Sequence, residues 1–334
     1  MPLSEMIPPI GTDDFLRESG WAGAQVTPLA GDASFRRYFR VACGDKHAVL
    51  MDAPPPHEDP RPFILMAEYL TRIGLSAPRI IHRDLDAGLL LIEDLGDDRM
   101  REAVDADIAR ESAIYSGVVD VLIELHRHAP PTGLRPHDMA NWRDELDLFI
   151  DWYGPTVGLS LDRASFHGAW GAVLSPIMED SQPWVTELRD FHAENVMLIA
   201  GAAGVQHFGL LDFQDARIGH PAYDLVSMLE DARRDVTPVI EKAMLAHYMA
   251  ATDRDSGFED AYWTLGAQRN TRILGVFCRL WRRDGKAHYT SFQARMWGLL
   301  ERNLEQPGLA PVRAWFDTNV PQDKRAPYWI DLVI

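Results

Sequence analysis

The chain has few cysteines and no long apolar runs, and each shortage excludes a class of protein. Its 334 residues include only two cysteines, Cys43 and Cys278, which lack a metal-binding spacing. We interpret both as thiols in a reducing compartment. No segment approaches the roughly 18 consecutive apolar residues of a membrane span, and the N-terminus lacks the charged and apolar regions of a secretion signal. These absences predict a cytoplasmic protein that does not enter a membrane.

Positive charge is also scarce. The formal net charge is −17, and the chain has four lysines. Proteins that bind nucleic acid through its phosphates normally present a basic face, so we expect no nucleic-acid partner. The glycine motifs GxGxxG and GxxxxGK[ST] are absent, which disfavours a Rossmann or P-loop nucleotide site.

The pattern of apolar residues changes at about residue 96. Before it, short β-prone runs lie at 35–42, 47–52, 79–82 and 88–95, with another strand near 24–29 and a helix at 61–73. After it, apolar residues recur with the period of a helix, and we expect helices at 105–128, 141–153, 165–179, 221–235, 237–251, 258–283 and 290–304. The sequence therefore predicts an α+β fold of two lobes, a small β-rich one over 1–96 and a larger, mainly helical one over 97–334.

One segment carries a pattern typical of phosphoryl transfer. In LRDFHAENVMLIAGAAGVQHFGLLDFQD (188–215), Asp190 is followed five positions later by Asn195. Two apolar runs around a glycine turn then lead to Asp212, which predicts a hairpin that returns a carboxylate to the loop. Kinases use this order for a catalytic Asp and two metal ligands. The pattern predicts an ATP-dependent kinase in which Asp190 is the catalytic base and Asn195 and Asp212 hold Mg²⁺.

The same segment, continued through ARIGHPAYDLVSML, resembles the aminoglycoside phosphotransferase superfamily, from about residue 25 to about residue 285. The resemblance implies a bilobal, protein-kinase-like fold that acts on small molecules. The strings GDASFRRYFRV, VLMDAPP, ELDLFIDWY and QRNTRILGVFCRL are similar to the anomeric kinases of N-acetylmuramate and N-acetylglucosamine, which serve peptidoglycan recycling. This narrower resemblance implies ATP and a small sugar as substrates and no obligate protein partner.

The resemblance also implies nucleotide-binding residues. The turn that covers the phosphates falls on Gly31, Asp32, Ala33 and Ser34. The hinge whose backbone binds adenine falls on Ile92, Glu93, Asp94 and Leu95.

The chain departs from the family where kinases place a phosphate-gripping lysine, near the end of the third strand. That position is Met51. Strand alternation places Arg37 on one face with Phe39 and Val41, and Arg36, Tyr38 and Arg40 on the other. We expect Arg37 to bind an ATP phosphate or an acidic residue such as Glu68; the alternative is that these arginines are solvated surface residues.

Two segments are candidate walls of the acceptor site. The helix at 141–153 combines aromatic rings suited to a sugar with charged groups, and 268–283 carries arginines that could bind a carboxylate. Ordinary helix surfaces are the alternative for both, and loop packing is the alternative for His192. The candidate substrate-binding residues are His192, Arg143, Glu145, Trp152, Arg269 and Arg279. Asp215 and Asp224 are interpreted as turn and capping residues.

Two functional alternatives remain open at this point. The same chemistry could act on an aminoglycoside, choline or ethanolamine, homoserine or a ketosamine. The missing lysine would also fit a nucleotide-binding pseudokinase with a regulatory role.

Overall fold

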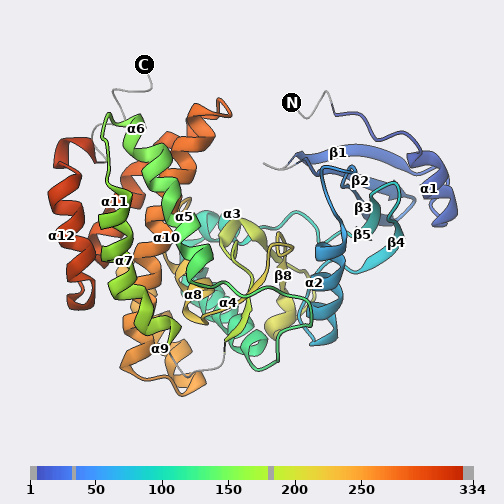
Figure 1. The fold of residues 1–334 in the computed structure, drawn as a ribbon. Helices are drawn as coiled ribbons and strands as arrows, with labels where there is room; N and C mark the ends of the chain where they lie inside the picture. Colours follow the sequence, from blue (N-terminus) through green and yellow to red (C-terminus); the bar gives the residue numbers. More distant parts are fainter. Residues whose placement is uncertain (1–5, 32–34, 180–183, 326–334) are drawn as a thin grey trace. The chain divides into compact units, whose positions relative to one another are not determined.

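The computed structural model describes residues 6–31, 35–179 and 184–325, and the chain divides into two compact units (Figure 1). The first unit comprises 1–131 and 194–216, and the second comprises 132–193 and 217–334. The predicted domain boundary at residue 96 thus lies inside the first unit. Asn195 and Asp212 belong to the first unit and Asp190 to the second.

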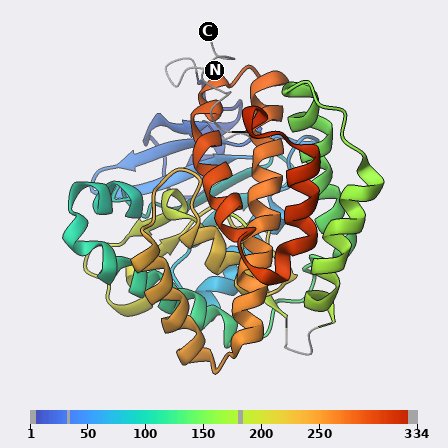
Figure 2. The ribbon, with the colours of Figure 1, turned by 90° about the vertical axis from the view of Figure 1, so that its left-hand side faces the viewer.

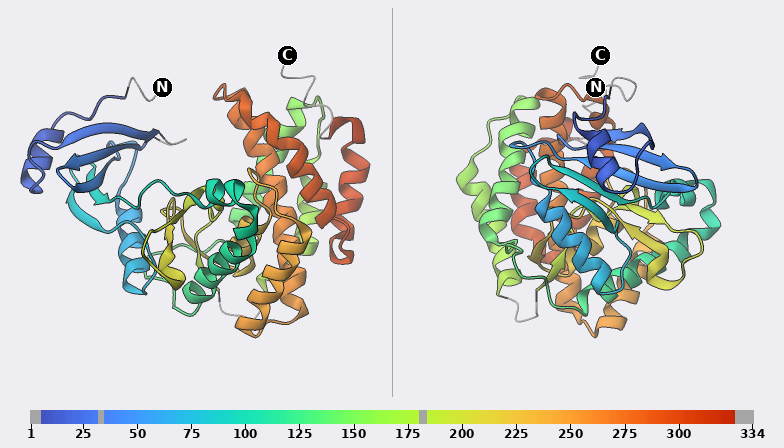
Figure 3. Two further views of the ribbon diagram at one scale, coloured as in Figure 1. Left: turned by 180° about the vertical axis from the view of Figure 1, so that it is seen from behind. Right: turned by 90° about the vertical axis from the view of Figure 1, so that its right-hand side faces the viewer.

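The first unit contains an antiparallel sheet (Figure 3). Its five strands follow the order β1-β2-β3-β5-β4. Its strands are β1 (Gln25–Gly31), β2 (Arg37–Cys43), β3 (Lys46–Asp52), β4 (Ile80–Asp84) and β5 (Leu89–Glu93). A two-residue turn joins β2 to β3, where Gly44 has a φ of 60° that only glycine adopts without strain. The register places Tyr38 opposite Met51 and Arg37 opposite Asp52.

One face of this sheet forms a core with helix α1 (Thr12–Glu18). Alternate residues of β2, β3 and β5 point to this face. The cluster includes Phe15, Leu16, Trp21, Phe39, Val41, Ala48, Leu50, Leu89 and Leu91. Each large side chain contributes about 1.5–3 kcal/mol when fully buried. Because a slip of one residue would expose the whole set, this core fixes the register of the strands.

The rest of the first unit is helical apart from one hairpin. It contains α2 (Arg61–Arg72), α3 (Met100–Ala106), α4 (Glu111–His126), β7 (Val196–Leu198) and β8 (Phe208–Leu210). The helix predicted over 105–128 is wrong at its beginning, because α3 ends at Ala106 and a 3₁₀ turn over Ile108–Arg110 precedes α4. The carboxylate of Asp107 accepts the N–H of Ala109, and this local bond competes with a continuous helix.

Helices dominate the second unit, in which α10 packs against α5, α8 and α11, and α7 packs against α12 (Figure 2). Its elements are α5 (Met139–Leu148), α6 (Gly154–Thr156), α7 (Arg163–Met178), β6 (Val185–Glu187), β9 (Arg217–Gly219), α8 (Ala222–Leu229), α9 (Pro238–Thr252), α10 (Ser256–Arg282), α11 (Gln293–Asn303) and α12 (Ala310–Asn319). The predicted helix at 141–153 changes to a π turn over Phe149–Tyr153. At this point a Cβ on Gly275 would lie 2.3 Å from the Leu148 carbonyl carbon, so glycine permits the close approach of α10.

Within the described ranges, no helix combines the length and apolar character that crossing a membrane requires.

Candidate functional site

The hairpin of β7 and β8 returns Asp212 to Asn195, as the sequence spacing predicts. Asn195 immediately precedes β7, and Asp212 follows β8 by two residues. The N–H of Leu211 donates to the carbonyl of Asn195 at 2.9 Å. Asn195 Nδ2 then lies 3.4 Å from Asp212 Oδ2, so one small ligand can reach both side chains.

Asp212 has a left-handed backbone conformation, and polar side chains surround its carboxylate. Its φ is 57°, a left-handed conformation that costs a non-glycine residue about 1–3 kcal/mol. Gln214 Nε2 donates to Asp212 Oδ1 at 2.7 Å, and Arg36 Nη2 lies 3.7 Å from the same oxygen. Next to it, Phe213 stacks on Phe63 of α2 with ring centroids 5.0 Å apart. These contacts hold the carboxylate in a conformation that the local chain does not favour.

The donor set of Asn195 and Asp212 fits Mg²⁺. This cation binds oxygen ligands, usually one or two carboxylates with waters and substrate phosphates. Over the part of the chain that the structure describes, no three or more His, Cys, Asp and Glu side chains are grouped to hold a metal. A pair of one carboxylate and one amide oxygen suits a metal that is shared with substrate phosphates.

In the second unit, Asp190 lies in a loop anchored by Asp224 of α8. The Asp224 carboxylate accepts the N–H groups of Leu188 at 2.5 Å and of Arg189 at 2.8 Å. Asp224 is therefore not the helix cap that the sequence suggested, because it binds the backbone of a distant loop. Burial, aided by Glu187, raises the pKa of Asp224 to about 8. Arg189 has a φ of 72°, so the residue before Asp190 also depends on these tertiary contacts.

A buried group of charges holds the Arg189 side chain. Arg189 pairs with Glu145 of α5. Glu145 also lies 3.2 Å from His137 and 3.8 Å from Arg272, and it accepts from Gln268 Nε2 at 3.2 Å. Burial alone would raise the pKa of Glu145, but Arg272, His137 and Arg189 outweigh it and hold the pKa well below its usual range.

His137 is the titratable member of this group. Its Nδ1 lies 2.7 Å from Glu187, and its ring is fully buried. Burial opposes protonation, but Glu187 and Glu145 outweigh it and raise the pKa of His137 to about 9. Since the unfolded pKa is about 6.5, the charged imidazole stabilises the fold fully below about pH 6.5. This stabilisation is lost as the pH rises through 9.

We therefore expect His137→Asn to lower the melting temperature more at pH 6 than at pH 9.5. The part of the loss in unfolding free energy that depends on pH should be on the order of 1–3 kcal/mol. Differential scanning calorimetry at both values measures it, with His47→Asn on the exposed end of β3 as the matched control. A loss in His137→Asn that is equal at the two pH values would contradict the charge assignment.

The predicted nucleotide-binding residues lie along the sheet of the first unit. Gly31 ends β1 opposite Arg37, and Asp32, Ala33 and Ser34 lie outside the described residues. Glu93 ends β5 and pairs with Arg79 at 2.8 Å. Asp94 pairs with Arg40 at 2.7 Å. Leu95 lies so near Gly209 that a Cβ there would be 2.8 Å from Leu95 Cδ1.

The acidic partner of Arg37 is Asp52, and not Glu68 as the sequence suggested. Arg37 Nε donates to Asp52 Oδ2 at 2.8 Å, because the two residues are directly opposite in the β2–β3 register. Glu68 of α2 pairs instead with Arg83 at 3.4 Å.

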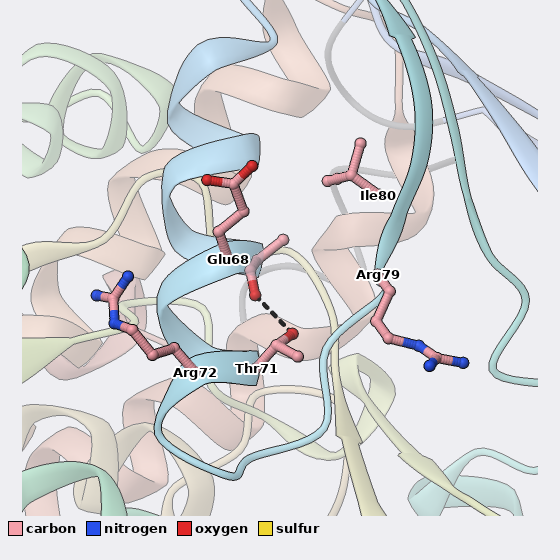
Figure 4. A pocket seen from close by; sticks show the side chains of 6 residues that line it. Glu68, Thr71, Arg72, Arg79 and Ile80 are labelled. Atoms are coloured by element: carbon pink, nitrogen blue, oxygen red, sulfur yellow. Dashed lines mark hydrogen bonds between the residues drawn. The ribbon is translucent and has the colours of Figure 1, made fainter.

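Glu68 lines a surface pocket of about 320 Å³ between α2 and β4, with Ala67, Thr71, Arg72, Arg79 and Ile80 (Figure 4). None of these six is among the predicted site residues.

The six predicted acceptor residues differ in burial. Arg143 is exposed on α5, and Trp152 and Arg279 are half-buried. Arg269 is buried and donates from Nη1 to the carbonyl of Glu230 at 3.3 Å. His192 is buried, and burial together with Arg233 lowers its pKa to about 3, so its imidazole is neutral at pH 7. Glu145 is held in the charge cluster described above.

Sequence reasoning named Glu145 and the arginines of 268–283, but it did not find His137, Glu187 or the role of Asp224. His137 and Glu187 are far apart in the sequence and follow no spacing rule. Arg36 belongs to the strand predicted at 35–42, where alternation places it on one face with Tyr38.

Comparison with known proteins identifies relatives of this chain. A model of the phosphotransferase enzyme family matches residues 25–258. The N-acetylmuramate/N-acetylglucosamine kinase of Caulobacter vibrioides is 36% identical, over 93% of this chain and 96% of its own. The enzyme of that name from Pseudomonas aeruginosa is 35% identical, over 88% of this chain and 89% of its own.

Solved structures share the fold at low sequence identity. A choline/ethanolamine kinase family protein from Mesorhizobium loti has a TM-score of 0.63 at 15% identity, over 90% of this chain and 97% of that chain. A choline kinase from Streptococcus pneumoniae has a TM-score of 0.61 at 14% identity, over 90% of this chain and 99% of that chain. The expected α+β, protein-kinase-like fold is thereby confirmed. With the family model covering most of the chain, this protein belongs to the phosphotransferase enzyme family.

Proposed function

We propose that this protein is an ATP- and Mg²⁺-dependent kinase of the cytoplasm that phosphorylates the anomeric hydroxyl of N-acetylmuramate and N-acetylglucosamine. The observation that carries the choice of acceptor is the 36% identity, over 93% of this chain, to a kinase named for these two sugars. The placement of Asn195 beside Asp212 supports the phosphoryl-transfer chemistry.

In this proposal Asp190 orients the anomeric hydroxyl and accepts its proton. The sugar oxygen attacks the γ-phosphorus of ATP, the bond to the bridging oxygen breaks, and ADP leaves. An anomeric hydroxyl is more acidic than an ordinary alcohol, which eases the transfer of its proton to Asp190. Asn195 and Asp212 would hold the metal, which neutralises charge on the phosphate oxygens when bound.

We assign the nucleotide contacts to residues of the first unit and the sugar contacts to residues of the second. In the first unit, residues 31–34 are our candidates to cover the phosphates. The backbone of 93–95 would meet adenine, since the Glu93 and Asp94 side chains are already paired. In the second unit, the exposed or half-buried Arg143, Trp152 and Arg279 are our candidates for sugar contacts. For His192 and Arg269, burial favours a role in shaping the site behind those contacts. For Glu145, its ion pair with Arg189 favours the same role.

The test is ADP formation with N-acetylmuramate, N-acetylglucosamine, kanamycin, choline and homoserine at equal concentrations. We expect turnover on the two amino sugars. The methyl glycoside of N-acetylglucosamine, whose anomeric oxygen is blocked, is the matched control and should be inert. Turnover of the glycoside would place the phosphate on another hydroxyl, and turnover of choline or kanamycin alone would overturn the assignment of the sugar.

Because Met51 replaces the lysine that binds phosphate in other kinases, a second candidate function is a pseudokinase that binds ATP without transferring phosphate. Binding of ATP without turnover on any acceptor would favour it.

A further inference from the structure

Kinases hold the nucleotide phosphates with a lysine that pairs with a glutamate, and this chain does not form that pair at the corresponding positions. Met51 occupies the lysine position and is fully buried, between Tyr38 of β2 and Leu90 of β5 in the register. Glu68, at the glutamate position of α2, pairs with Arg83 at the surface pocket. If the chain binds ATP as proposed, the positive charge must come from another residue.

We propose that Arg36 supplies this charge and binds the ATP phosphates beside Asp212. This inference rests on the proposed kinase function. Arg36 is 8% exposed, and its Nη2 lies 3.7 Å from Asp212 Oδ1. All of these atoms belong to the first unit. The guanidinium is therefore held next to the carboxylate proposed to bind the metal, where phosphate oxygens would gather.

The strand geometry explains why Arg36 can replace residue 51. Tyr38 is opposite Met51, so both side chains leave the same face of the sheet. Arg36 immediately precedes β2, two residues before Tyr38, and its approach to Asp212 places its guanidinium near that end of the strand. Arg37 projects to the opposite face, where it lies over the ring of Phe39 in the core.

Arg37 is already paired with a buried carboxylate. Arg37 makes hydrogen bonds to Asp52 at 2.8 and 2.5 Å, and Asp52 is 2% exposed. Removing Arg37 from this pair would leave a buried carboxylate uncompensated, which is costly. The 3.7 Å separation of Arg36 and Asp212 is longer than a charged hydrogen bond. With ATP bound, the Arg36 guanidinium would lie beside both the metal ligand and the phosphates, and a guanidinium can hold two phosphate oxygens at once.

Isothermal titration calorimetry with Mg·ATP and with adenosine separates the phosphate contribution from the base contribution. We expect Arg36→Ala to weaken Mg·ATP binding by about 10- to 100-fold and to leave adenosine binding unchanged. Arg36→Lys should recover part of the loss, because it keeps the charge but not the bidentate geometry. Arg83→Ala, which removes one exposed charge from the same unit, is the control for net charge.

Each other outcome has a definite meaning. Equal Mg·ATP affinity in wild type and Arg36→Ala would overturn the proposal. So would a loss in Arg37→Ala without a loss in Arg36→Ala, which would support the first expectation from the sequence. If Arg36→Ala does not fold, Arg36→Gln takes its place, with the apo melting temperature as the check. Wild type that binds no Mg·ATP would refute the proposed kinase function itself.

Discussion

Asp190→Asn should lower the turnover number by about 10²- to 10⁴-fold, the range of a general base, with little change in the affinity for Mg·ATP. The variant keeps the size and hydrogen-bonding shape of the side chain but cannot accept the proton of the acceptor hydroxyl. The loop should keep its conformation, because Asp224 anchors it through the N–H groups of Leu188 and Arg189 rather than through Asp190 itself. Steady-state kinetics with N-acetylglucosamine measures the effect.

The control for Asp190→Asn is Asp215→Asn. Asp215 is exposed and belongs to the same 188–215 segment, so the change removes one carboxylate without touching the proposed site. We expect it to keep wild-type turnover. Near-wild-type turnover in Asp190→Asn would show that Asp190 is not the base, and a large loss in Asp215→Asn would show that general charge in this segment matters instead.

Asp212→Asn should lower turnover by about 10²- to 10⁴-fold as well, because a bound metal supplies several kcal/mol of charge stabilisation in such reactions. Unlike Asp190→Asn, this variant should need a higher Mg²⁺ concentration for half-maximal rate. Wild type should lose activity in EDTA and regain it on addition of Mg²⁺. A Mg²⁺ titration of both variants distinguishes the two roles.

Asp212→Gly separates the ligand role of Asp212 from its strained backbone. Glycine adopts the observed φ of 57° without steric cost, so this variant should melt no lower than Asp212→Asn. We expect it to be at least as inactive. Recovery of activity in Asp212→Gly would mean that the carboxylate is dispensable and that the loss in Asp212→Asn came from the backbone.

The sequence by itself determined the features that depend on local spacing. The alternation of β2 and β3, the long helices of the second unit, and the hairpin that joins Asn195 to Asp212 all follow from periodicity and turn residues close together in the chain. Such features are set by hydrogen bonds over a few residues, and a single sequence displays them directly.

Only the tertiary structure decided which charges meet. The partner of Arg37 depends on strand register, and the anchor of the Asp190 loop is Asp224, 36 residues beyond Leu188. Glu145 and Arg272 meet because Gly275 lets α10 approach α5. Ion pairs do not recur at a fixed spacing in the sequence. They form where the fold buries a charged side chain, because a buried charge without a partner is costly. The same rule brings Arg36 to Asp212, where the sequence had pointed to its neighbour.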